Sequence, residues 1–209
     1  MRAVVFAVMA LFSTLALAQA PAFEEGKHYF VIEPAQPTSS GNKIEVVEAF
    51  MYTCPHCADL EPFLLAYRKN LPADVQFVPM PVAWNGGAEA FARAYYAAET
   101  LGIVEKTHEP MFAAIHKEGV RFTNMEDIAN WYAKYGVTAE AFLSAANSFA
   151  VNTKINRSKT MVPRYGITGT PMVVVNGKYR VDVSSAGGHQ QLVDVLKFLV
   201  DKERATKKP

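Results

Sequence analysis

Two cysteines separated by two residues are the groups in this sequence best suited to covalent chemistry. They form the segment Cys54-Pro55-His56-Cys57, and the 209-residue chain has no other cysteine. A buried-strand pattern, Ile44–Phe50, ends shortly before Cys54, and helical spacing of apolar residues begins at Cys57. A strand followed by Cys-x-x-Cys at a helix start is typical of a redox site that exchanges its disulfide with other thiols.

The position of Cys54 at the start of a helix favours its thiolate. Free backbone N–H groups and the positive end of the helix dipole stabilise an anion there, so the pKa of Cys54 is expected to fall. Cys57, one turn further in, is expected to be shielded and to keep a higher pKa. Cys54 is therefore predicted to be the attacked and exposed sulfur and Cys57 the resolving one. A stabilised Cys54 thiolate makes the disulfide a stronger oxidant.

The two residues between the cysteines are also predicted to belong to the site. Pro55 limits the freedom of the backbone, and His56 brings a ring N–H, and a charge when protonated, close to the Cys54 sulfur. The alternative for His56 is a solvated surface histidine. A purely structural disulfide is a poor alternative for the whole segment, because closing so short a loop constrains the unfolded chain least.

A second motif lies about 115 residues after the cysteines. Thr170-Pro171 precedes a strongly apolar strand, and proline is tolerated at the first position of a strand. A cis Thr170–Pro171 bond would bring the backbone next to another loop. The alternative is a trans proline that merely starts the strand.

Residues 1–18 have the features of a secretory signal peptide, with one positive charge, an apolar run and small residues at the end. Cleavage is expected after Ala18, with Ala20 as the alternative site, and an uncleaved membrane anchor is the competing interpretation. Export would place both cysteines where disulfides persist.

The composition excludes several classes of protein. Half of the residues are hydrophobic and the formal net charge is +1, so the chain can build a core but has no basic field for nucleic acid. No phosphate loop, dinucleotide fingerprint or metal-ligand spacing is present, and no cofactor or metal is expected. His108 and His116 are expected on the surface of a helix. The large aromatic residues are expected in a core between two lobes, with the lining of a groove as the alternative; they are Trp84, Phe91, Trp131 and Phe149.

The apolar periodicity predicts an α/β sheet domain interrupted by a helical block. Asn124 and Thr138 are predicted helix N-caps, Asn176-Gly177 is predicted to be a hairpin turn, and the prolines of the third strand predict an edge position. Strands are expected at 28–32, 44–50, 75–82, 171–175 and 178–183. Helices are expected from 57 and at 88–101, 104–117, 125–135, 138–161 and 189–202, and residues 203–209 are expected to be disordered.

Taken together, these segments resemble the DsbA family of thioredoxin-fold disulfide oxidants of the bacterial periplasm. The resemblance runs from about Phe23 to Lys202 and rests on residues 24–29, 47–50, 54–57 and 169–179, together with the helical block. It implies a thioredoxin fold with an inserted all-helical domain. The implied organisation is a signal peptide at 1–18, thioredoxin-like parts at 19–84 and 163–203, a helical insertion at 85–162 and a basic tail at 204–209.

The same resemblance implies roles for individual residues. Cys54 would be the nucleophile and Cys57 its buried partner. Thr170 and Pro171 would form a cis-proline pair beside the disulfide and offer backbone groups to an extended substrate chain.

Two carboxylates are candidates for tuning the proton transfer of the buried cysteine. Glu48 lies inside an apolar strand and Glu61 on the helix that follows the cysteines, and family members carry acids at both places. An exposed position is the alternative for each of them. Pro79 stands on the neighbouring strand, in Pro79-Met80-Pro81, where some relatives have a lysine partner, so the charge balance of the acids is an open point.

These features predict a periplasmic thiol:disulfide oxidoreductase that donates its disulfide to newly exported unfolded proteins with free thiols. The resemblance implies reoxidation by a quinone-linked membrane oxidase of the DsbB type, and a monomer is expected. One alternative is a disulfide isomerase or reductase of the same fold. A second is a thiol-based metal chaperone, although no third cysteine supplies another soft ligand.

Overall fold

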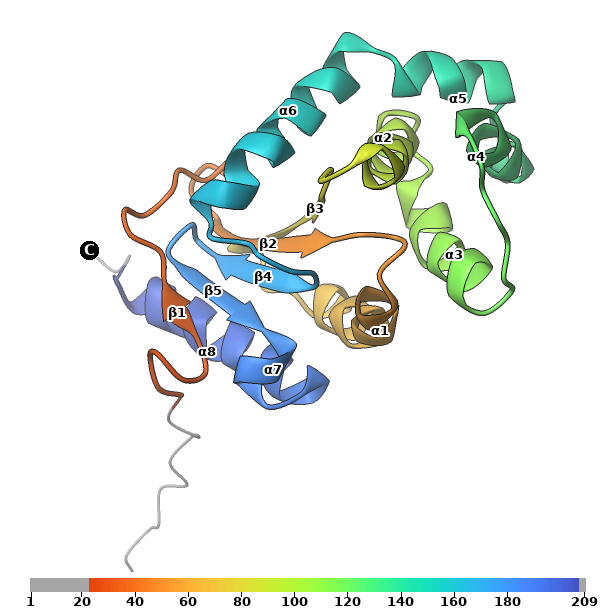
Figure 1. Cartoon of the computed structure of the whole chain (residues 1–209). Helices are drawn as coiled ribbons and strands as arrows, with labels where there is room; N and C mark the ends of the chain where they lie inside the picture. Colours follow the sequence, from red (N-terminus) through yellow and green to blue (C-terminus); the bar gives the residue numbers. More distant parts are fainter. Residues whose placement is uncertain (1–22, 207–209) are drawn as a thin grey trace, which may run out of the picture.

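A computed structural model describes residues 23–206, and the predicted signal peptide lies outside this range. Its centre is a five-stranded mixed sheet with the strand order β1-β5-β4-β2-β3 (Figure 1). The strands are β1 (Phe30–Val31), β2 (Ile44–Phe50), β3 (Val75–Pro81), β4 (Met172–Val175) and β5 (Tyr179–Asp182). Within residues 23–206, no helix has the length and apolar character needed to cross a bilayer.

Strand β2 lies inside the sheet, between β4 and β3, and all seven of its residues are buried. It pairs parallel with β3 and antiparallel with β4, and Glu48 lies opposite Pro79 in the register with β3. Strand β3 is at the edge of the sheet, as its prolines predict, since proline cannot donate a ladder hydrogen bond to a further strand.

The turn between β4 and β5 is confirmed at Asn176-Gly177. Both residues have a positive φ, 51° and 66°, as a two-residue turn that matches the strand twist requires. A Cβ atom on Gly177 would collide with the backbone carbonyl oxygen of Gln36, so only glycine fits at that position.

Helices cover both faces of the sheet (Figure 1). On one face, α1 (Pro55–Lys69) and α8 (His189–Thr206) pack side by side, with the short α7 (Val183–Ala186) leading into α8. Successive residues of β2 point to opposite faces. Val46 therefore joins the core beneath α1 and α8, while Val47 packs with Met161 and Val162 of α6 on the other face.

The helical block consists of α2 (Gly86–Thr100), α3 (Val104–His116), α4 (Met125–Tyr132), a 3-10 turn (Ala133–Tyr135), α5 (Ala139–Ala146) and α6 (Phe149–Arg164). Asn124 and Thr138 accept hydrogen bonds from backbone N–H groups at the starts of α4 and α5, which confirms both predicted caps. The core of this block is continuous with the cysteine segment, because Phe50, Cys54 and Cys57 belong to it.

Two expectations about the helices are wrong. The helix expected over 138–161 is two helices, because Ser148 caps a new one and accepts from the N–H of Val151. The tail expected to be disordered from 203 continues α8 as far as Thr206. Glu203 is buried there and accepts hydrogen bonds from Asn176 and Lys178.

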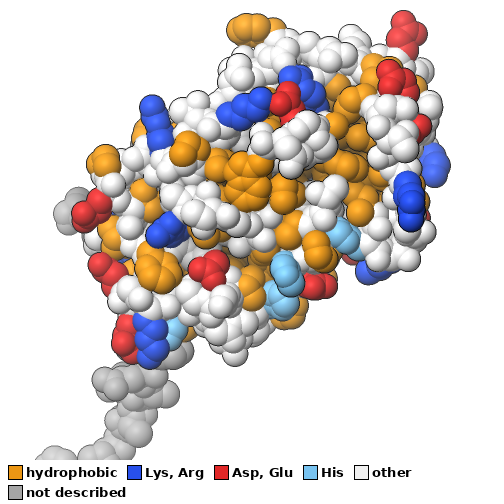
Figure 2. All heavy atoms as spheres, in the orientation of Figure 1, with side chains coloured by type: hydrophobic (Ala, Val, Ile, Leu, Met, Phe, Trp, Pro, Cys, Tyr) orange, Lys and Arg blue, Asp and Glu red, His pale blue; other side chains and the backbone are white. Residues whose placement is uncertain are grey.

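The four large aromatic residues also differ from expectation in part. Trp131 is buried and Phe91 half-buried, but Trp84 is 44% exposed and Phe149 is 87% exposed. Both exposed rings lie at the start of a helix, before its buried face begins. Figure 2 shows apolar side chains gathered over the middle of the helical block, with few charged side chains among them.

Candidate active site

The end of β2 and the start of α1 position the two cysteines. Cys54 is the N-cap residue of α1, with an extended backbone, and Pro55 follows at the first helical position, where a missing N–H costs nothing. Both cysteines are free thiols. The expectation of an exposed Cys54 is wrong, because only 8% of this residue is exposed, but it is more accessible than Cys57, which is fully buried. Pro55 and His56 between them are exposed.

The surroundings of the two sulfurs drive their pKa values in opposite directions. The largest influence on the pKa of Cys54 is a hydrogen bond from the Cys57 thiol, which lowers it. Thr170 and the backbone N–H groups of Cys57 and His56 lower it further, and together these contacts outweigh burial, which acts in the opposite direction. These contacts lower the pKa of Cys54 to about 5. Burial raises the pKa of Cys57 far above its ordinary value, with the hydrogen bond to Cys54 as the next cause. At neutral pH the first sulfur is a thiolate and the second a thiol.

The loop before β4 completes the surroundings of Cys54. The Thr170–Pro171 bond is cis, as expected from the sequence. In the thiol form, Sγ of Cys54 donates to the carbonyl oxygen of Thr170 at 3.3 Å, across 116 residues of sequence. A cavity of about 460 Å³ lies beside this contact and is lined by residues that include His56, Thr170, Pro171, Asp182 and His189. The two predicted motifs therefore meet at one surface hollow.

Both candidate carboxylates are buried, so the alternative of exposed acids is wrong. Glu48 has no exposed surface, and neither of its carboxylate oxygens has a hydrogen-bond partner among the described residues. Burial raises the pKa of Glu48 to about 8, and the nearby charge of Glu61 adds to the rise while Arg68 opposes it. Glu48 is therefore protonated in most molecules at neutral pH.

Glu61 has the opposite balance. Burial opposes its ionisation, but His108 and Arg68 outweigh burial and hold the pKa of Glu61 below its usual range. Nη2 of Arg68 donates to Oε1 of Glu61, and Nε2 of His108 lies 3.6 Å from Oε2. Arg68 thus supplies the positive charge that Pro79 cannot give, and His108 faces the same carboxylate.

The placement of His108 on the surface is wrong. His108 is buried, with 5% of the residue exposed, and its ring packs edge-on against Phe50 and Phe112. Nδ1 of His108 lies 2.8 Å from the hydroxyl of Tyr52. The spacing of His108 four residues before the apolar Phe112 could have indicated a buried helix face. His116, about two turns after His108 on the same helix, is half-buried and contacts the carbonyl of Tyr52.

Glu48, Glu61 and His108 form the group of described residues best placed to hold a metal ion. One ligand atom from each lies within 4.8 Å of the others, and all three residues are buried. The guanidinium of Arg68, however, already forms an ion pair with the Glu61 carboxylate. Its fixed positive charge repels a metal cation at the same carboxylate. The three side chains are therefore better suited to binding a proton than a metal ion.

Replacing Glu48 with glutamine is expected to stabilise the protein at neutral pH. Below pH 4.5, Glu48 is protonated in both the unfolded and the folded protein. As the pH rises from there toward about 8, Glu48 ionises in the unfolded chain but stays protonated in the folded protein, so the wild type loses stability. Glu48→Gln removes this loss, so its advantage over the wild type should be about 3 kcal/mol at pH 7 and vanish near pH 4. Urea unfolding across this pH range measures it.

Glu45 offers a matched control on the same strand. It is equally buried, but its Oε2 accepts hydrogen bonds from Ser39 and Ser40, so Glu45→Gln should destabilise the protein at pH 5 and at pH 8 alike. An unchanged pH dependence of unfolding in Glu48→Gln would contradict the raised pKa of Glu48.

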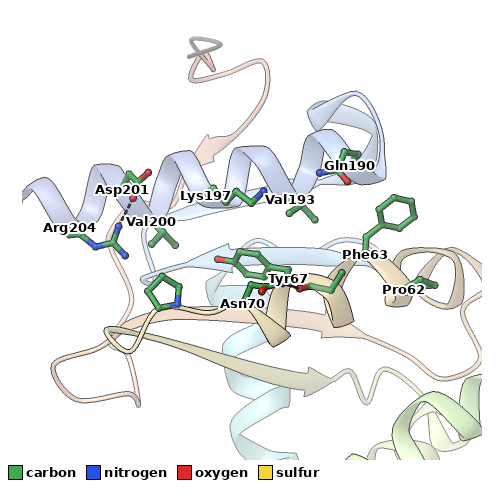
Figure 3. Close-up of a pocket in the computed structure, with 12 residues that line it drawn as sticks. Pro62, Phe63, Tyr67, Asn70, Gln190, Val193, Lys197, Val200, Asp201 and Arg204 are labelled. Carbon is green, nitrogen blue, oxygen red and sulfur yellow. Dashed lines mark hydrogen bonds and ion pairs between the residues drawn. The ribbon is translucent and has the colours of Figure 1, made fainter. Parts of the chain in front are cut away.

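A cavity larger than the hollow beside Cys54 lies away from this chemistry. It measures about 700 Å³ and runs between α1 and α8, where Tyr67 and Val193 face each other across it (Figure 3). Arg204 and Asp201 form an ion pair at one end. No residue of the cysteine segment or of the Thr170 loop lines this cavity, so its size does not mark the redox site.

Comparisons with known proteins agree with this geometry. The family described as DSBA-like thioredoxin domain matches residues 45–197. The thiol:disulfide interchange protein DsbA of Pseudomonas aeruginosa is 39% identical over 203 residues, which is 97% of this chain and 96% of the relative. The DsbA of Pseudomonas syringae pv. tomato is 41% identical over 198 residues, covering 95% of this chain and 92% of that protein.

Solved structures give the same result. The crystal structure of Pseudomonas aeruginosa DsbA matches with a TM-score of 0.85 at 39% identity and covers 90% of this chain and 97% of its own. The oxidoreductase DsbA from Xylella fastidiosa matches with a TM-score of 0.82 at 34% identity, covering 90% of this chain and all of the other.

Proposed function

Because the chain belongs to the DsbA family of thioredoxin-fold thiol:disulfide oxidoreductases, we propose that it oxidises thiol pairs in newly exported, unfolded proteins. Cys54 and Cys57 are the groups that would exchange electrons with the substrate. The observation that carries this proposal is the contrast between the two sulfurs, an ionised Cys54 at a helix start beside a buried, protonated Cys57.

In the proposed reaction the oxidised protein carries a Cys54–Cys57 disulfide. A substrate thiolate attacks Sγ of Cys54, the S–S bond breaks, and Cys57 leaves with the electron pair and takes up a proton. A second substrate thiolate then attacks the substrate sulfur of the mixed disulfide, and Cys54 leaves as a thiolate. The substrate gains a disulfide and the protein gains two electrons and one proton.

The direction of the reaction follows from the stability of the products. A thiolate with a pKa of about 5 is a good leaving group, and its stabilisation favours the reduced protein over the disulfide. Cys57, fully buried, cannot be reached by an incoming thiolate. These properties support an oxidant of thiols and disfavour a reductase, for which the disulfide would have to be the stable form.

Thr170 and Pro171 are proposed to bind the substrate chain. The carbonyl of Thr170 contacts Sγ of Cys54, and both residues line the hollow beside it. An extended chain bonded to Cys54 would lie along this loop and pair with its backbone, which recognises main chain rather than particular side chains. Such recognition suits substrates of many different sequences.

Glu48 and Glu61 are proposed to serve the proton balance of Cys57. The charge of Glu48 is one of the causes that raise the pKa of Cys57. Glu48, protonated in most molecules at neutral pH, is suited to give its proton to the Cys57 thiolate as the disulfide breaks. Glu61 stabilises that protonated state by its own charge.

The proposed setting is the periplasm, after removal of residues 1–18, with the protein acting as a monomer. Each turnover leaves the protein with two additional electrons, so an acceptor must regenerate the disulfide. A quinone-linked membrane oxidase of the DsbB type fits this need. We also propose the division into thioredoxin-like parts at 19–84 and 163–203, a helical insertion at 85–162 and a tail at 204–209.

Incubating the oxidised mature protein with a reduced, unfolded protein that has several cysteines tests this function. We expect substrate thiols to disappear in proportion to the protein disulfide added, with matching substrate disulfides detected by mass spectrometry. A disulfide isomerase would instead act in its reduced form on scrambled disulfides, and a metal chaperone would bind a metal ion through both thiols. Unchanged substrate thiols would reject the proposal.

Changing Pro55-His56 to Gly-Pro is expected to make the disulfide less oxidising. Proline at position 56 lacks the backbone N–H that stabilises the Cys54 thiolate, and the imidazole is lost as well. A hydrogen bond to a charged group contributes about 1.5–3 kcal/mol, so the equilibrium with glutathione should move at least about tenfold toward the disulfide.

His56→Ala separates the two contributions of this residue, because it keeps the backbone N–H and removes only the ring. We expect a smaller shift of the glutathione equilibrium for this variant than for Gly-Pro. Equal equilibria for the wild type and the Gly-Pro variant would contradict the part assigned to His56.

A further inference from the structure

Glu48 and Glu61 form a buried acid pair in which Glu48 cannot exchange protons with solvent directly. The inference drawn from this rests on the proposed function. Glu48 is fully buried, and both of its carboxylate oxygens lack hydrogen-bond partners among residues 23–206. If Glu48 gives its proton to Cys57, another group must replace that proton. Oε2 of Glu61 and Nε2 of His108 are the nearby buried polar atoms that also lack a hydrogen-bond partner.

Another cavity reaches this cluster and shares no lining residue with the hollow beside Cys54. It measures about 350 Å³ and lies between α1, α2 and α3. Glu61 and His108 line it, whereas Glu48 does not. Pro79 lines it too, opposite Glu48 in the sheet register, and its short ring leaves open the space that a long side chain would fill.

We propose that His108 passes protons between this cavity and the Glu61–Glu48 pair whenever Cys57 gains or loses its proton. As the disulfide breaks, Cys57 takes the proton of Glu48. Glu48 is reprotonated by way of Glu61 from the imidazolium form of His108, which gives up its Nε2 proton and becomes a neutral imidazole with the remaining proton on Nδ1, toward Tyr52. His108 then recovers a proton from solvent in the cavity. During reoxidation the same proton travels outward, so no atom or electron is left over.

The geometry of His108 suits this task. Tyr52 holds Nδ1 at 2.8 Å, which fixes the ring, while Nε2 points to Oε2 of Glu61 at 3.6 Å. A short rotation of either side chain closes this gap to a hydrogen bond. Arg68, the other group on Glu61, stays charged under all ordinary conditions and cannot deliver a proton.

The charged and titratable groups around His108 favour the arrival of protons. They are Glu48 from β2, Tyr52 from the loop after it, Glu61 and Arg68 from α1, Tyr95 and Glu99 from α2, and Glu105 and Glu109 from α3. Carboxylates outnumber the single fixed positive charge on the cavity wall. Burial raises the pKa of Tyr52 and of Tyr95, so neither phenol exchanges a proton near neutral pH. Histidine is the side chain suited to that range.

His108→Gln tests the proposal, with His116→Gln on the same helix as the matched control. The oxidised proteins are reduced with dithiothreitol in single turnovers between about pH 5 and pH 9, and the Cys54 thiolate is titrated by its ultraviolet absorbance. We expect His108→Gln to slow the reduction at least about tenfold near pH 7 and to change its pH profile. The thiolate titration should stay as in the wild type, because Cys54 does not contact His108.

A second variant guards against a loss of packing in the first. His108→Ala enlarges the cavity, and imidazole added to the buffer should restore its rate in a saturable way, whereas His116→Ala should gain nothing. Wild-type rates in His108→Gln, or folded His108→Ala without rescue, would overturn the proposal. A wild-type protein that fails to oxidise thiols would instead overturn the proposed function.

Discussion

Replacing Cys57 with serine is expected to leave the protein attached through Cys54 to the exported proteins it meets. The Cys54 thiolate, favoured by its helix-start position, attacks a substrate disulfide and forms a mixed disulfide. In the wild type the adjacent Cys57 thiol breaks that bond again within the molecule. An intramolecular thiol acts at a very high effective concentration, so its loss should lengthen the life of the complex at least about a hundredfold.

The complementary variant Cys54→Ser is the control. Its remaining sulfur, Cys57, has no exposed surface and a raised pKa, so it should trap few proteins or none. Non-reducing gels of periplasmic extracts, followed by mass spectrometry of the linked peptides, measure both variants. Equal trapping by the two would contradict the assignment of an attacked and a shielded sulfur.

The fold class and the cysteine chemistry could be predicted because local sequence patterns determine them. The thioredoxin fold with its helical insertion is confirmed by the match to DsbA structures. Cys54 lies at a helix start because an apolar strand ends just before it and Pro55 begins the helix. Such signals need only a few neighbouring residues, which the chain shows directly.

The surroundings of the acids could not be predicted, because they depend on groups that are far apart in sequence. Glu61 is buried only because Arg68 and His108 meet it there, and His108 arrives from a different helix, 47 residues away by their numbering. Period analysis places a polar residue on a solvated face by default. For the same reason Glu203 is expected in a disordered tail. It is instead buried, and it accepts hydrogen bonds from Asn176 and Lys178 at the turn between β4 and β5.

The reduced protein is expected to be more stable than the oxidised protein above about pH 6.5, the reverse of a structural disulfide. The pKa of Cys54 falls from 9.0 in the unfolded chain to about 5 on folding. This stabilises the reduced form by about 2–3 kcal/mol at pH 7. Against it, closing the four-residue loop stabilises the oxidised form by about 2 kcal/mol in a chain-entropy description. The reduced form should therefore lead by about 1 kcal/mol at pH 7.

The pH dependence of this difference gives the sharper test. A depressed pKa adds stability that is complete above the unfolded value, near 9, and is lost as the pH falls through about 5. The lead of the reduced form should grow by about 2 kcal/mol between pH 7 and pH 8.5 and reverse near pH 6. Cys57 is neutral in the folded and in the unfolded reduced protein below about pH 8, so its ionisation does not remove the trend. Guanidinium unfolding of the two forms across this range measures the difference, and an oxidised form that stays more stable up to pH 8.5 would mean that the disulfide is a structural crosslink.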